Sequence, residues 1–165
     1  MKKFTLLTGL ISLLMMVACN CPKPEVVDKA TEIAAVKKVL DKYRAANENQ
    51  DMNLIEEIWS PEEHIVSIGT ENGERLVGFS QIREAIQRQF DSFSETFITP
   101  ANQSIEVSDD GNTAWFSQMM NYNFILNGTP YSFRNLRYSG VLVKKDGKWK
   151  LVQTHMSVAY NPLQE

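Results

Sequence analysis

The chain has 165 residues, with 17 lysines and arginines against 20 aspartates and glutamates, which gives a formal net charge of −3 at pH 7. This acidic balance, without a basic patch or an arginine-rich stretch, argues against a nucleic-acid partner and against electrostatic docking on anionic lipid. Both cysteines lie within the first 21 residues. The folded part of the chain is therefore expected to have no disulfide and to be stabilised by its core alone.

The N-terminus shows the three parts of an export signal. Two lysines follow the first methionine, residues 4–17 are uncharged and mostly apolar, and Ala18 stands directly before Cys19. The apolar run is shorter than the roughly 20 residues of a membrane span and suits a signal peptide, and the cysteine resembles a lipobox. We expect residues 1–18 to be a lipoprotein signal peptide and Cys19 to be the lipidation site. An ordinary signal peptide with a chance cysteine is the alternative.

This pattern predicts a location in the cell envelope, on the periplasmic side or at the cell surface, with membrane attachment through the lipid alone. Residues 19–28 contain Cys21 and two nearby prolines, which is typical of an extended tether. Residues 29–165 are then long enough to form one domain with a single core.

The first half of this domain has helical periodicity. Apolar residues recur at spacings of three and four in residues 29–47, which predicts a long helix. Asp51 is a suitable N-cap for a short second helix, which a Ser-Pro pair ends. A short strand at 65–68 and a turn lead to residues 75–78, and Ser80 is expected to cap a third helix. The apolar face of that helix is formed by Ile82, Ile86, Phe90 and Phe93.

The second half of the domain alternates between apolar and polar residues, as strands do. The expected strands cover residues 97–107, 113–126, 131–144 and 148–160. The Asn127-Gly128 and Asp146-Gly147 pairs between them are strong hairpin signals. Helices followed by long antiparallel strands predict an α+β domain, with the helices on one face of a curved sheet.

Several short motifs accompany this order of elements. They are the run Lys145–Val152 with His155-x-Ser157, Ile68-Gly69-Thr70 with Val77-Gly78, and Arg137-x-Ser139. Over residues 30–162 the chain resembles the nuclear transport factor 2-like fold, and specifically its SnoaL-like branch. The resemblance implies a cone-shaped half-barrel, in which a mainly antiparallel sheet wraps around three helices from the N-terminal half. It also implies a pocket between sheet and helices and frequent dimerisation. Because members include isomerases, cyclases and dehydratases, the fold alone does not set the function.

The turn at Asp146-Gly147 determines which side chains face the helices. A glycine bulge at this turn would place Arg137 opposite His155, and both would point inward. We prefer this register because it gathers the apolar residues of both strands on one face. A plain two-residue turn would bring Tyr138 near His155 instead.

The preferred register predicts a cluster of polar side chains beneath the aromatic side chains of Trp59 and Phe90. The expected ligand-binding residues are Trp59, Phe90, Met120, Tyr122, Asn135, Arg137 and Ser157, with His155 as a candidate general base. An inward arginine would favour a carboxylate or another anionic group. Structural roles are the alternative: His155 as a core histidine, and Arg137 as the ion-pair partner of Glu56 or Glu57.

These residues favour a domain that binds a small anionic or amphipathic organic ligand in its cone. One alternative is an isomerase, cyclase or dehydratase with His155 as the base, and another is an interaction module that forms a homodimer. No cofactor is expected, and a metal site lacks ligands because the chain has only two histidines, His64 and His155, and no cysteine within the fold. No inward position of the long strands carries a carboxylate, which distinguishes the chain from carboxylate-dependent isomerases of this fold.

Overall fold

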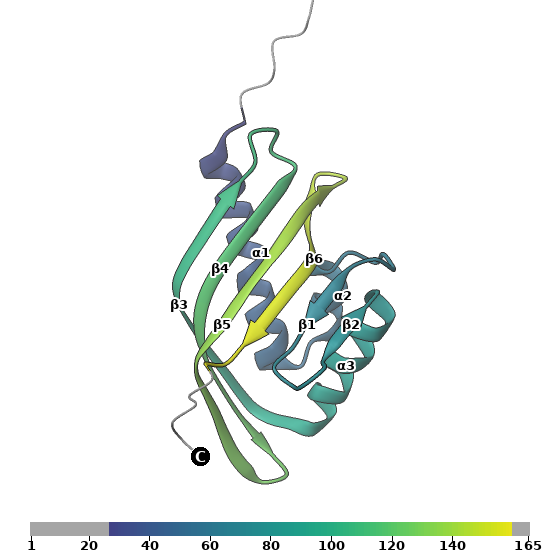
Figure 1. The fold of residues 1–165 in the computed structure, drawn as a ribbon, viewed down its shortest axis with the longest axis vertical. Helices are drawn as coiled ribbons and strands as arrows, with labels where there is room; N and C mark the ends of the chain where they lie inside the picture. The colour runs from purple at the N-terminus through teal and green to yellow at the C-terminus, as the bar shows by residue number, and fades with distance from the viewer. Residues whose placement is uncertain (1–26, 160–165) are drawn as a thin grey trace, which may run out of the picture.

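The computed structural model describes residues 27–159. The expected signal peptide, the lipidation site Cys19 and most of the tether lie outside this range. Within it, three helices pack against one face of a six-stranded, curved sheet (Figure 1). This arrangement confirms the expected α+β cone.

The first helix, α1 (Lys29–Asn49), begins where the tether was expected to end. The Asp28 carboxylate accepts hydrogen bonds from the backbone N–H groups of Ala30 and Thr31, at 3.2 and 3.3 Å. A side-chain acceptor at this position satisfies N–H groups that the helix leaves unpaired. The last residue assigned to the tether therefore belongs structurally to the domain.

The two shorter helices begin in different ways. In α2 (Met52–Ile58), Asp51 accepts from the N–H groups of the next turn at 2.9 and 3.3 Å, which confirms the expected cap. The α3 helix (Phe79–Ser92) instead begins after Gly78, which has a φ of 82° and provides no side-chain cap. The expectation that Ser80 caps this helix is wrong, because the chain enters the helix through a backbone conformation that favours glycine.

The sheet joins two short strands to four long ones. The strands are β1 (Val66–Ile68), β2 (Arg75–Val77), β3 (Phe93–Val107), β4 (Thr113–Leu126), β5 (Thr129–Lys145) and β6 (Lys148–Ser157). Their order is β2-β1-β6-β5-β4-β3, and β1 runs parallel to β6 whereas the other neighbours are antiparallel. Figure 1 shows α1 crossing the long strands while α3 lies beside β1 and β2.

The two faces of this sheet differ sharply in burial. We call the face toward the helices the inner face and the opposite one the outer face. On β4 every second residue is buried on the inner face: Ala114, Phe116, Gln118, Met120, Tyr122 and Phe124. On β5 these residues meet Leu136, Tyr138 and Leu142, which are also buried. The α1 side chains Val36, Leu40 and Tyr43 pack in the same core, together with buried residues of α2 and α3.

The β5–β6 turn differs from the expected one. Asp146 and Gly147 have φ values of 49° and 74°, and Lys145 pairs with Lys148, which makes a two-residue hairpin turn without a bulge. Left-handed backbone at both turn residues fits the twist of antiparallel strands. The pairing moves β5 by one residue against the preferred register, and Arg137 therefore points to the outer face.

A bulge lies further along β6 instead. Leu151 and Gln153 pair with consecutive residues of β5, which leaves Val152 as an extra residue. An extra residue reverses the alternation of the strand beyond it. Leu151 is consequently buried before the bulge and Thr154 after it, and His155 faces outward.

One polar cluster ties the start of α1 to the β5–β6 hairpin. Glu32 accepts a hydrogen bond from Trp149 Nε1 at 2.8 Å and pairs with Lys144 at 2.6 Å. The Lys144 ammonium also lies 5.1 Å from the centre of the Trp149 ring. The hydrogen bond from Lys144 is the main reason that the pKa of the Glu32 carboxyl is below its ordinary value.

Candidate functional site

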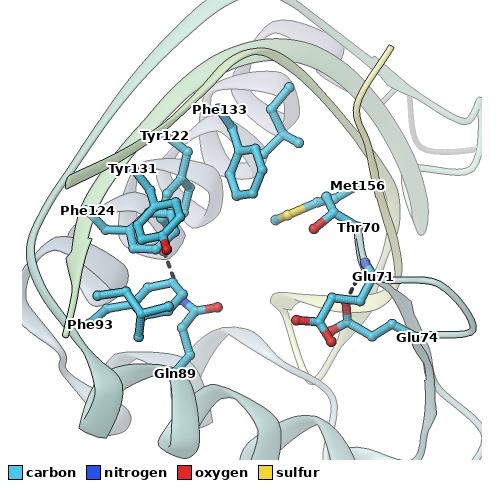
Figure 2. Close-up of a pocket in the computed structure, with 12 residues that line it drawn as sticks. Thr70, Glu71, Glu74, Gln89, Phe93, Tyr122, Phe124, Tyr131, Phe133 and Met156 are labelled. Atoms are coloured by element: carbon cyan, nitrogen blue, oxygen red, sulfur yellow. Dashed lines mark hydrogen bonds between the residues drawn. The ribbon is translucent and has the colours of Figure 1, made fainter. Parts of the chain in front are cut away.

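A cavity of about 310 Å³ opens at the end of the cone where α3 and the β4–β5 hairpin meet. Its volume is at the lower end of the range for small-molecule sites. It is lined by Thr70, Glu71, Glu74, Gln89, Phe93, Tyr122, Phe124, Leu126, Tyr131, Phe133, Leu136 and Met156. Figure 2 shows an aromatic side and, across the open space, a side formed by the β1–β2 turn.

The aromatic side consists of rings that contact one another. Phe124 stacks on Phe93 with ring centres 3.9 Å apart, and on Tyr131 with centres 5.4 Å apart. Tyr122 meets the edge of Phe124 at 5.8 Å, and Phe133 lies 6.0 Å from it. Such stacked and edge-to-face pairs hold the rings in defined orientations. The result is an apolar wall, which we call the aromatic wall, that can contact a flat or branched organic molecule.

A polar group lies at the base of this wall. The Tyr122 hydroxyl donates to Asn47 Oδ1 at 3.1 Å and accepts from Gln89 Nε2 at 2.8 Å. Gln89 Nε2 also donates to Asn47 Oδ1 at 3.0 Å. Burial raises the pKa of the Tyr122 hydroxyl well above its ordinary value of 10.0, so that this group stays a neutral phenol. In Figure 2 the amide oxygen of Gln89 points toward the cavity, where it can accept a hydrogen bond.

The opposite side carries the only charged residues among those that line the cavity, Glu71 and Glu74. The Glu74 carboxylate accepts from the backbone N–H of Glu71 at 3.2 Å. Backbone hydrogen bonds from Gly69 and Glu74, at 3.2 and 3.1 Å, close the turn that carries both side chains. The β1–β2 turn thus supplies the carboxylates that the inward positions of the long strands lack.

The residues expected to form the site are dispersed. Arg137, Asn135 and His155 are exposed, and Ser157 pairs with Arg137 on the outer face. The inward placement of this group is wrong because the two-residue turn displaces β5 and the Val152 bulge displaces the end of β6. Asn135, with a φ of 54°, lies at a further bulge between β4 and β5.

The remaining expected residues lie inside the molecule. Trp59, Phe90 and Met120 are buried in the core and do not line the cavity. Tyr122 does line it, and its role in ligand binding stays a prediction. Continued alternation along β4 from Tyr122 could have identified Phe124 and Leu126 as well, whereas Glu71 and Glu74 had no signal beyond their place in a turn.

Between residues 27 and 159, no group of three or more histidine, cysteine, aspartate or glutamate side chains is arranged to hold a metal ion. Over the same range, no helix is both long and apolar enough to cross a membrane.

The cone with a pocket at its open end defines the class of domain, which is the nuclear transport factor 2-like fold. The SnoaL-like domain family matches residues 36–161, and the chain belongs to this family. The expected family is therefore confirmed. No curated protein matches the chain.

Solved structures with the same fold are distant in sequence. A nuclear transport factor 2-like superfamily protein from Salmonella enterica serovar Typhimurium superposes with a TM-score of 0.73 at 21% identity, covering 82% of this chain and 97% of that one. A protein of the same fold family from Streptomyces avermitilis, named as a candidate dehydratase, has a TM-score of 0.71 at 15% identity, covering 80% and 99%. A Novosphingobium aromaticivorans protein, named as a candidate scytalone dehydratase, has a TM-score of 0.70 at 13% identity, covering 82% and 95%. At these identities the likeness establishes the fold alone.

Proposed function

We propose that this domain binds a small amphipathic organic molecule in the cavity at the open end of its cone. The observation that carries the proposal is the aromatic wall beside the polar group of Tyr122 and Gln89. Apolar walls with a few convergent polar groups are typical of small-molecule sites, since the walls supply affinity and the polar groups fix orientation. The apolar part of the ligand would lie on the rings and its polar end would reach Gln89.

The charge of the cavity bears on which molecules it admits. The expectation of an anionic ligand depended on Arg137, which lies on the outer face. The two charged residues that line the cavity are glutamates, and like charges in a partly desolvated site repel. We therefore favour an uncharged or cationic ligand over an anionic one.

Ligand capture tests this proposal without a guess at the compound. The purified protein is denatured, and released small molecules are identified by mass spectrometry. The Phe133→Ala variant should capture about tenfold less of the compound than the unchanged protein, because the substitution removes part of the aromatic wall. Phe97→Ala is the matched control, since Phe97 is 61% exposed and does not line the cavity. Equal loss in both variants would contradict binding at the wall.

A second candidate function is catalysis of proton transfer, supported by the two carboxylates beside the cavity. A glutamate can remove a proton from a bound molecule, and the carboxylic acid so formed can return that proton to a leaving group. Two of the similar structures carry dehydratase names. If the captured compound is a substrate, Glu74→Gln should slow its conversion by about 10²–10⁴. His155→Gln should not, because His155 is exposed on the outer face.

We also propose that the protein is a lipoprotein of the cell envelope, anchored through Cys19. The support is the sequence pattern before the cysteine, and α1 begins only ten residues beyond it. Cys19→Ser should release the protein from the membrane fraction or leave the precursor uncleaved, since acyl chains contribute about 0.8 kcal/mol per buried CH₂. Cys21→Ser should change neither. Membrane association that persists in the Cys19 variant would exclude this anchor.

We propose that the outer face contacts a second copy of the chain. Phe97 and Trp115 are large apolar residues exposed there. A homodimer through this face would bury both side chains, as interfaces commonly do with aromatic residues. Sedimentation velocity should then show a dimer for the protein and a monomer for Trp115→Glu, and a monomer in both would exclude this arrangement.

A further inference from the structure

The charged residues that line the cavity are all of one sign. Glu71 and Glu74 line it, and no lysine, arginine or histidine does. Within residues 27–159 neither glutamate forms an ion pair, although seven such pairs occur elsewhere in that range. Carboxylates without a cationic partner beside an apolar wall leave a negative potential in the cavity. A ligand of positive charge would complement it.

Gly69 determines where one of these carboxylates lies. A Cβ atom at this position would come within 1.8 Å of Glu74 Oε2, so a side chain there would displace the carboxylate. The absence of a side chain allows Glu74 to rest against the end of β1, where the Glu71 N–H holds it. Figure 2 shows the glutamates facing the aromatic wall across the cavity.

The aromatic wall attracts the same sign of charge. The face of an aromatic ring is electronegative, and ammonium groups bind over ring faces within about 6 Å of the centre. The rings of Phe93, Phe124 and Tyr131 are stacked on one another, with interplanar angles of 11°, so the faces open to a ligand belong to the more exposed rings, Tyr131 and Phe133. Ring faces on one side and carboxylates on the other are the combination that recognises alkylammonium groups.

We propose that the ligand of this cavity is an amine that binds as its ammonium cation. This inference rests on the proposed small-molecule function and specifies its class of ligand. The ammonium group lies between the β1–β2 turn and the rings, where Glu74 and Glu71 neutralise it. The apolar body of the amine packs on Phe124, Tyr131 and Phe133. The Gln89 amide oxygen is a further acceptor for an N–H group.

Three probes of nearly equal shape separate charge from apolar contact. 2-Phenylethylamine is a cation at pH 7, 2-phenylethanol is neutral, and 3-phenylpropanoate is an anion. Calorimetric titration of the purified protein should show the amine binding about tenfold more tightly than the alcohol, with the anion weakest. If the alcohol binds as tightly as the amine, the cation inference is wrong while the small-molecule function stands. If none of the three binds, both fail.

Variants that remove charge test which residues cause the preference for the amine over the alcohol. The double variant Glu71→Gln with Glu74→Gln should lower amine affinity to that of the alcohol and leave alcohol affinity unchanged. Gly69→Ala should reduce the preference as well, because it displaces the Glu74 carboxylate without removing it. Glu84→Gln is the matched control, since Glu84 is exposed on α3 and does not line the cavity. An amine preference that survives in the double variant would overturn the proposed role of these carboxylates.

Discussion

The inner and outer faces of this sheet are built from the same strands, yet they differ in almost every physical property. The inner face packs its alternate residues against α1 and ends in a cavity with an aromatic wall. The outer face carries Trp115, Arg137 and His155, all exposed. Neighbouring residues on one strand therefore lie in environments as different as core and solvent. A change of one residue in register exchanges them.

The alternation of the long strands is interrupted at four places. These are the Val152 bulge, the bulge at Asn135, and irregular pairing in β3 at two points, between Ser94 and Phe97 and between Ala101 and Ser104. Bulges also bend a strand and increase its twist. The bulges that curve the sheet into a cone therefore also determine which side chains reach the cavity.

The largest expected difference between the faces is the loss of stability when a tryptophan on each face is removed. Trp149 is buried on the inner face and its indole N–H is bonded to Glu32, whereas Trp115 is 49% exposed on the outer face. Trp149→Ala should lower the free energy of unfolding by about 3–5 kcal/mol. Trp115→Ala should lower it by about 1 kcal/mol or less. Urea denaturation of both variants measures the difference.

Equal losses in the two variants would contradict the assignment of the faces. A cost for Trp115→Ala that grows with protein concentration would instead reveal burial of that side chain in a dimer.

A second difference concerns tyrosines, since within residues 27–159 Tyr43, Tyr122 and Tyr138 are buried on the inner side of the sheet. Burial raises the pKa of Tyr43, Tyr122 and Tyr138 above the ordinary value of 10.0. In the unfolded chain these groups ionise near that value, so the unfolded state is favoured as the pH rises above it. Stability should be unaffected by them below about pH 10 and should fall above it, by about 1.4 kcal/mol per pH unit for each tyrosine.

Tyr138→Phe isolates one of these contributions. Denaturation midpoints measured from pH 8 to pH 11 should fall less steeply for this variant than for the unchanged protein. The stability of each protein at pH 7 serves as the reference for its own pH series. Parallel curves would mean that Tyr138 is ionised as easily in the folded protein as in the unfolded chain.

The smallest expected effect on stability comes from substitutions on the outer face. Arg137→Leu and His155→Gln remove a charge and an imidazole that lie on neighbouring strands, exposed to solvent. Each should change the free energy of unfolding by about 0.5 kcal/mol or less. Neither should alter capture of a small molecule. Loss of the captured compound in either variant would show that the outer face takes part in binding.

Local patterns in the sequence were sufficient to predict most helices and strands of this fold. Helical periodicity located α1, Asp51 marked the start of α2, and Asn-Gly and Asp-Gly pairs located both long hairpins. Each of these signals acts over a few residues, through capping, turn geometry or amphipathic alternation. The motifs of the last strands were also sufficient to identify the SnoaL-like family.

The site was decided by tertiary structure. A bulge adds one residue to a strand without changing its composition, so the sequence around Val152 did not reveal that His155 would face outward. The place of Glu71 and Glu74 depends on the parallel pairing of β1 with β6, which sets Ile68 beside His155 across the long interval between them. Alternation and turn signals report only on near neighbours in the chain. The cavity, by contrast, joins a turn, a helix and a hairpin that only the packed sheet brings together.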